Sequence, residues 1–175
     1  MGSPIGAERL DVPLGFDVPD EWRPVDPATA GAPGAVVVLI REGVPASAGF
    51  TPNITMGLAR RTDDASAADI ADEAIGRLAA TGVEVAVLER DVLDEQDAPC
   101  VTQLIECKQA DRTVVQSQVH LLIPLGDAPQ DRLAVEMVCS CTPPQLPAVT
   151  GDFQQFVASF HIRDDEQGKP DATAD

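Results

Sequence analysis

The chain has 175 residues, of which 44% are hydrophobic, so it is long enough for one globular domain with one buried core. Its 29 acidic and 12 basic residues give a net charge of -17, and a surface of that sign repels nucleic-acid phosphates and anionic lipid headgroups. These features argue against nucleic-acid binding, and the lack of any apolar run of about 20 residues argues against membrane insertion.

The first predicted strand follows a Pro-rich and Gly-rich surface loop at residues 23–34. The run AVVVLIRE, residues 35–42, has β-branched residues on both alternating faces, which predicts a strand that is covered on both sides. The run NITMGLARR, residues 53–61, alternates and predicts a second strand. Pro52 cannot donate to a β ladder and Asn53 can bond to nearby backbone, so both residues suit the start of this strand.

An amphipathic helix is predicted at residues 63–82, where small and apolar residues recur at helical spacing opposite charged ones. Ser66 is the expected N-cap, with Asp69 three residues further on. Glu73 and Arg77 are four residues apart, so we expect them to form a surface ion pair.

A meander of strands is predicted after this helix. Residues 83–90 and 100–108 read as strands that are joined by an acidic hairpin loop at 91–99. Residues 112–123 read as the next strand, and the short turn before it implies antiparallel pairing. Residues 132–141 alternate and predict the last strand.

A second helix is predicted at residues 150–161, and the tail that follows lacks apolar periodicity, so we expect it to be disordered. The apolar stripe of this helix, at i, i+3, i+4 and i+7, consists of Phe153, Phe156, Val157 and Phe160. We therefore expect a single α+β domain at 1–163, built as an antiparallel sheet of about six strands packed by two helices, and a disordered acidic tail at 164–175.

Cys139 and Cys141 alternate with one residue between them, so they point to the same strand face, about 7 Å apart, which is too far for an easy disulfide. Apolar residues occupy that face, so we interpret both cysteines as core thiols. Zinc binding together with Cys100 or Cys107, redox chemistry and a cross-strand disulfide stay open as alternatives.

The polar strand face formed by Gln116, Gln118 and His120 is the candidate site for binding a partner. His161 is predicted in the last helical turn, where a cation suits the helix dipole. Neither histidine accompanies a nucleophile motif, and no phosphate-loop, zinc-protease or nucleophile-elbow motif occurs in the sequence. The acidic clusters lack the spacing of a calcium loop and are interpreted as a solvated helix start and hairpin tip.

The order of these predicted elements resembles that of a known fold. The early segment GFDVPDEWRPV, a hairpin that includes Trp22, followed by one helix, a meander and a final helix, resembles the PsbP-like fold. Within this fold the chain is most similar to the actinobacterial LpqN-like family, over residues 10–162. The strand-start signature F-x-P-N-I of that family corresponds to Phe50, Pro52, Asn53 and Ile54.

The resemblance implies an α/β/α sandwich and a protein that binds other proteins without chemistry of its own. Relatives of the fold include a Ran-binding nuclear import factor, a photosystem subunit and, distantly, Eag-type effector chaperones. This is an analogy between folds. It agrees with our interpretation of Trp22, the single Trp, as a core anchor, although a binding hot spot is the alternative.

We therefore expect a non-enzymatic protein-binding, chaperone-like or adaptor module with no cofactor and no metal. Its partner would be another protein, and a homodimer is the alternative assembly. It should expose an apolar patch or groove that the two helices leave uncovered. The alternative is a small-molecule or metal-binding protein, or an enzyme with an unrecognised site, with a closed polar pocket near His120 or the cysteines. The N-terminal sequence has no export signal and no cysteine for lipid attachment, so we expect a cytoplasmic protein.

Overall fold

The structure is a computed structural model that describes residues 12–93 and 98–163. The predicted disordered tail at 164–175 and the tip of the predicted hairpin loop lie outside the described residues. The described residues form the following helices and strands, in chain order. They are β1 (Leu14–Gly15), β2 (Trp22–Pro24), β3 (Val37–Arg41), the 3-10 helix η1 (Ala46–Ala48), β4 (Asn53–Arg61), α1 (Ala67–Ala80), β5 (Glu84–Leu93), β6 (Cys100–Gln109), β7 (Arg112–Pro124), β8 (Arg132–Cys141), the 3-10 helix η2 (Pro143–Gln145), α2 (Leu146–Ser159) and β9 (His161–Ile162).

The main sheet has seven strands in the order β2-β3-β4-β8-β7-β6-β5, and every neighbouring pair is antiparallel. Strands β5 to β8 form the predicted meander. Strand β8 then lies beside β4, which joins the N-terminal strands to the meander. The predicted α+β class with an antiparallel sheet is thus confirmed.

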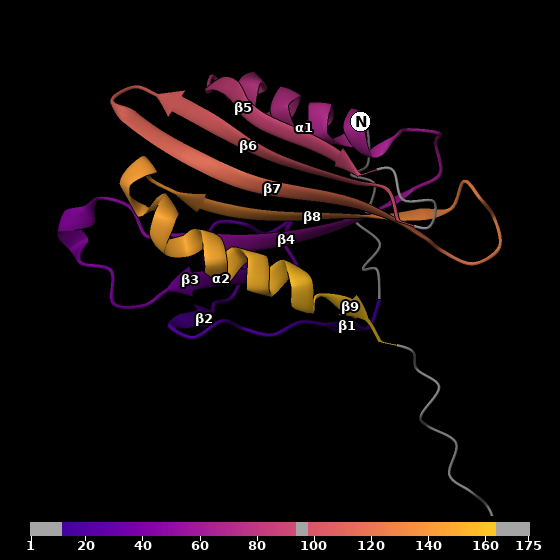
Figure 1. The fold of residues 1–175 in the computed structure, drawn as a ribbon, viewed down its shortest axis with the longest axis horizontal. Helices are drawn as coiled ribbons and strands as arrows, with labels where there is room; N and C mark the ends of the chain where they lie inside the picture. Colours follow the sequence, from indigo (N-terminus) through magenta and orange to yellow (C-terminus); the bar gives the residue numbers. More distant parts are fainter. Residues whose placement is uncertain (1–11, 94–97, 164–175) are drawn as a thin grey trace, which may run out of the picture.

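The two helices cover opposite faces of the sheet, as Figure 1 shows. Helix α1 packs on β5, β6 and β7, whereas α2 packs along β8 on the other face. The short strands β1 and β9 pair with each other beyond the end of α2, with Leu14 opposite Ile162. This arrangement is the α/β/α sandwich that the resemblance implied.

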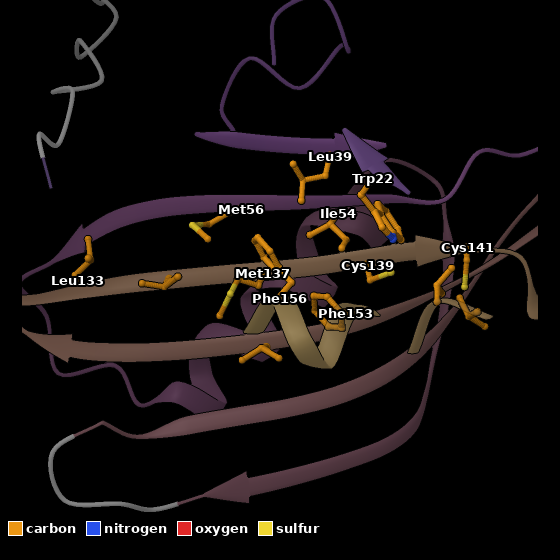
Figure 2. Packing of buried hydrophobic residues seen from close by; sticks show 14 residues of the cluster. Trp22, Leu39, Ile54, Met56, Leu133, Met137, Cys139, Cys141, Phe153 and Phe156 are labelled. Carbon is orange, nitrogen blue, oxygen red and sulfur yellow. The ribbon is translucent and has the colours of Figure 1, made fainter. Parts of the chain in front are cut away.

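The main hydrophobic core lies between the sheet and α2, and Figure 2 shows its packing. The alternation of β4 places Ile54 and Met56 on this face, where both are fully buried. Phe156 of α2 is also fully buried and meets Phe16 edge to face, with ring centroids 5.4 Å apart. Trp22 is only 5% exposed, so its predicted role as a core anchor is confirmed.

The predicted start of β4 is confirmed, because the strand begins at Asn53, directly after the buried Pro52. The Asn53 side-chain amide donates to the backbone carbonyl of Thr51 at 3.4 Å. The early segment is not the hairpin that we expected, since β1 pairs with β9 and β2 pairs with β3. The short β2 also takes the first residues of the predicted 23–34 loop.

The predicted capping of α1 is confirmed. The Ser66 hydroxyl accepts from the Asp69 backbone N–H at 3.1 Å, and the Asp69 carboxylate accepts from the Ser66 backbone N–H at 2.8 Å. The predicted Glu73–Arg77 ion pair is wrong. Arg61 on the neighbouring β4 end reaches Glu73 at 2.7 Å and takes it, while Arg77 pairs with Glu136 of β8 at 2.9 Å.

The predicted bounds of the second helix are wrong at both ends. α2 begins at Leu146 rather than residue 150, because proline needs no backbone N–H in the first helical turn and is tolerated there. The helix ends at Ser159, since Phe160 has extended backbone angles. His161 therefore lies in β9 and not in a helical turn, so the predicted dipole contact does not form.

Candidate functional site

The predicted site residues Gln116, Gln118 and His120 lie on the face of β7 that is directed toward α1. Gln118 and His120 are 3% and 1% exposed, whereas Gln116 is half-buried. The structure brings the three together, but most of their surface is inside the protein. Their role in binding a partner stays a prediction, and only Gln116 has substantial surface to offer.

A ladder of amide side chains crosses the strands beneath α1. Its links run from Gln103 Nε2 to Gln118 Oε1 at 2.7 Å, and from Gln118 Nε2 to Gln116 Oε1 at 2.8 Å. Gln116 Nε2 in turn donates a hydrogen bond to the Ser140 hydroxyl oxygen at 3.2 Å. At the other end, Arg90 donates twice to Gln103 Oε1. Each of the three amides thus donates and accepts, which removes most of the cost of burying them.

His120 joins this ladder through its Nε2, which is 3.1 Å from Gln118 Oε1. An amide oxygen only accepts, so Nε2 carries the proton and Nδ1 has the lone pair. Nδ1 lies 3.5 Å from Glu136 Oε2 and is buried with no hydrogen-bond partner among the described residues.

Burial, with smaller contributions from the guanidinium groups of Arg77 and Arg90, lowers the pKa of His120 to about 4. The Glu136 carboxylate by itself would favour a charged imidazole, but that carboxylate is already bound by Arg77. We therefore assign a neutral His120 at pH 7. A neutral imidazole shielded from solvent is poorly placed to exchange protons with a substrate.

A polar groove runs between α1 and the middle of the sheet, with a volume of about 430 Å³. Gln116, Gln118 and Ser140 contribute the end of the amide ladder to it, whereas Arg77 and Glu136 contribute an ion pair. His120 is not among its lining residues. These polar groups bond mainly to one another, so the groove presents few unmet hydrogen-bonding groups to a ligand.

A larger and more apolar groove, of about 510 Å³, lies on the opposite face of the sheet, and we call it the α2 groove. It exists because α2 follows β8 and leaves the part of the sheet formed by β5, β6 and β7 uncovered on this side. One wall is α2, and the floor is β6 and β7. Its apolar lining consists of Leu104, Val119, Leu146, Phe153, Val157 and Ala158.

Acidic residues border the α2 groove on the side away from α2. Glu89 and Asp91 of β5 line it there, opposite Leu104 and Thr102 of β6 in the strand register. Exposed polar residues of α2, Thr150 and Gln154, line the other side. The groove thus combines an apolar floor with an acidic border, and no prediction from the sequence had singled out its residues as a site.

The four cysteines are thiols rather than disulfides in the described part of the chain. Cys139 and Cys141 are 2% and 1% exposed and belong to the core beside α2, as their alternation predicted. Burial raises the pKa of the Cys139 thiol to about 12, with a smaller contribution from Cys141, and that of Cys141 to about 11. Both thiols are therefore protonated at neutral pH and weakly reactive.

No group of three or more His, Cys, Asp or Glu residues is placed to hold a metal ion within residues 12–93 and 98–163. Cys107 is buried on the α1 side of the sheet, opposite Val85 and Val114, and so points away from the Cys139 face. In the same ranges, no helix is both long and apolar enough to cross a membrane.

The architecture is that of the PsbP-like fold. Three solved structures illustrate the similarity. LpqN of Mycobacterium tuberculosis, described as involved in cell envelope biogenesis, has a TM-score of 0.63 at 13% identity over 86% of this chain and 83% of that one. Cyanobacterial PsbP from Synechocystis has a TM-score of 0.58 at 16% identity, over 93% of this chain and 99% of the other.

The third, the Ran-binding protein Mog1p of Saccharomyces cerevisiae, has a TM-score of 0.52 at 17% identity, over 85% of this chain and 89% of the other. The predicted resemblance to PsbP and LpqN is thus confirmed at the level of the fold. No protein-family model and no curated protein matches the sequence.

Proposed function

We propose that this protein is a non-enzymatic binding module that holds an apolar segment of a partner protein in the α2 groove. The observation that carries this proposal is the groove itself, an uncovered apolar surface of about 510 Å³ where the layer formed by α2 is incomplete. A protein-binding module was expected to have such a groove. The Ran-binding description of Mog1p adds support, because it places protein binding on this fold.

The chemistry of the described residues also favours binding over catalysis. His120 is neutral and buried, and the thiols of Cys139 and Cys141 are protonated within the core. A catalytic base or nucleophile needs an accessible group with a suitable pKa, and these three groups do not meet that requirement.

An apolar small molecule is the second candidate ligand, because the volume of the α2 groove falls within the range of about 300 to 1,000 Å³ that is typical of small-molecule sites. A cytoplasmic location remains part of the proposal. It is supported by four cysteines that are all thiols, as a reducing compartment would keep them.

The test uses two variants of neighbouring, exposed residues of α2. Gln154 lines the groove and Gln155 does not, so Gln154→Arg places a long charged side chain across the groove, while Gln155→Arg makes the same chemical change outside it. Wild type and both variants are purified gently from the native host and analysed by native mass spectrometry. Thermal melts check that all three are folded.

We expect a co-purified protein that is retained by Gln155→Arg and lost from Gln154→Arg. Its affinity for the purified proteins should differ by about tenfold or more between the two variants. Equal binding by both variants would refute a role for the groove. A bound mass of a few hundred daltons that only Gln154→Arg loses would establish the small-molecule alternative.

A further inference from the structure

The two edges of the main sheet differ sharply in how far they are protected. β2 forms one edge, has three residues and ends in Pro24, which has no backbone N–H to offer. β5 forms the other edge, runs for ten residues from Glu84 to Leu93 and contains no proline. Soluble proteins normally shorten, bend or charge such edges, because unpaired backbone groups there can pair with another chain.

The side chains of β5 also expose apolar surface. Four of the six large hydrophobic residues that are exposed in the described part of the chain lie on this strand, and their exposed fractions are between 46% and 56%. They are Val87, Leu88, Val92 and Leu93. A long edge strand with exposed apolar side chains is the surface that strand addition uses.

The two faces of β5 differ in their side chains, although Arg90 shares the face of Val92 and Leu93 shares the face of Asp91. Val87 and Val92 lie opposite Ile105 and Val101 of β6, on the α1 face of the sheet. Glu89 and Asp91 point to the other face, where they border the α2 groove. Val87 and Glu89 are two positions apart and would share a face in a regular strand. The register shift between them explains why they point to opposite faces.

Charge determines which kind of strand fits. β5 carries three exposed carboxylates, Glu84, Glu89 and Asp91, and its one guanidinium, Arg90, is bound by Asp72 at 2.8 Å. A second copy of this chain would bring another net charge of -17 to the same place, which opposes pairing of β5 with itself. A basic segment would be attracted instead.

We propose that the β5 edge accepts an extended segment of a partner protein in which basic and apolar residues alternate. The apolar residues would contact Val87 and Val92 on the α1 face, and the basic residues would meet Glu89 and Asp91 on the other face. The backbone of the segment would add an eighth strand to the seven-stranded sheet. This surface is separate from the floor of the α2 groove, so the proposal extends the binding function to a second element.

The test uses a fluorescein-labelled peptide of about eight residues with alternating Val and Lys, and measures anisotropy in about 0.15 M NaCl. Two matched peptides serve as controls. One carries N-methyl groups on alternate residues, which removes the backbone donors of one edge but keeps every side chain and charge. The other replaces each Lys with Glu.

The matched protein variants are Val87→Lys/Val92→Lys and Val18→Lys/Val36→Lys. Both pairs replace two exposed valines and change the net charge equally, but only the first pair lies on β5. We expect saturable binding of the Val-Lys peptide that is weakened about tenfold or more by N-methylation, by the Glu replacement and by the β5 variant. Val18→Lys/Val36→Lys should bind like wild type.

Several results would overturn the proposal. Equal binding of the N-methylated peptide would show attraction by net charge alone, without strand pairing. Loss of binding in Gln154→Arg together with full binding by the β5 variant would place the peptide in the α2 groove, which would favour the groove and refute the edge. A wild-type dimer in light scattering that the β5 variant converts to a monomer would show that a second copy covers this edge.

Discussion

The buried His120 predicts a loss of stability in mildly acidic solution. Its pKa is about 4 in the folded protein and about 6.5 in an unfolded chain, so the unfolded chain takes up this proton more readily. The contribution is negligible above about pH 7 and grows as the pH falls toward the folded-state pKa. The linkage between proton binding and folding gives a free energy of unfolding that is about 2 kcal/mol lower at pH 5 than at pH 7.5.

The window from pH 7.5 to 5 separates this effect from the carboxylates. Asp69 and Glu73 have pKa values that are lowered by hydrogen bonds to Ser66 and Arg61 respectively. Their contribution to stability is therefore lost only as the pH falls below about 4.5. The net negative charge becomes smaller as the pH falls, which relieves repulsion between acidic groups and stabilises the folded protein. A matched variant is therefore needed to subtract this opposite effect.

The assay is urea unfolding at pH 7.5 and pH 5, followed by the fluorescence of the single Trp22. His120→Gln removes the titrating group but keeps a neutral hydrogen-bonding side chain, and His161→Gln is the control in an exposed position. We expect wild type and His161→Gln to lose about 2 kcal/mol more than His120→Gln between the two pH values. Should the three proteins change in parallel, or should NMR show the His120 ring titrating above about pH 6, the assignment of a buried neutral imidazole is refuted.

The remaining predictions concern the core and the caps. Trp22→Phe removes the hydrogen bond from Trp22 Nε1 to Asp152 Oδ2, which is 2.9 Å long, and should destabilise the protein by about 1 to 3 kcal/mol in urea unfolding followed by circular dichroism, since this variant has no Trp or Tyr; no change would refute a contribution from this bond. Ser66→Ala removes the cap of α1 and should cost about 1 kcal/mol, measured in the same way. Met137→Ala empties a fully buried site and should cost about 2 to 5 kcal/mol, and a cost below about 1 kcal/mol would contradict the packing in Figure 2. Labelling of Cys139 by a disulfide reagent at pH 8, followed by mass spectrometry of its peptide, should be about 100-fold or more slower in the folded than in the unfolded protein, whereas similar rates would contradict its burial.

Strand alternation was the most informative signal in the sequence. It placed Cys139 and Cys141 on the apolar face of the strand at 132–141, and the structure has both in the core beside α2. Alternation indicates only which side chains of a strand share a face. It carries no information about which other strand lies beside it in the sheet. The sequence therefore indicated the faces of β4 and β8 but not that these two strands pair.

The candidate site was less predictable for the same reason. Gln116, Gln118 and His120 look like a solvated face when β7 is considered alone, because they alternate with apolar residues. The partner that helps to bury them, Gln103, comes from another strand, and α1 covers that face. Burial of a polar ladder depends on such tertiary contacts, which single-strand periodicity does not contain.

The α2 groove was predicted only as a general feature of a binding module. Its location depends on α2 running along β8 rather than over β6, which follows from side-chain packing between distant segments. Val157 gave a partial signal, since it belongs to the apolar stripe of α2 yet is only half-buried, and it lines the groove. The acidic alternation of Glu89 and Asp91 on β5 was the other available sign.

The position of β8 between β4 and β7 has a consequence for synthesis on the ribosome. β4 ends at Arg61 and must wait for β8, which begins at Arg132, before it gains its second neighbour in the sheet. The β2-β3-β4 unit therefore emerges with β4 unpaired along one edge, and the apolar face of β4 has no core to join because α2 is made later still. A nascent chain that is stalled before β8 should thus be sensitive to protease and dependent on chaperones, and resistance should arise only once α2 has left the exit tunnel.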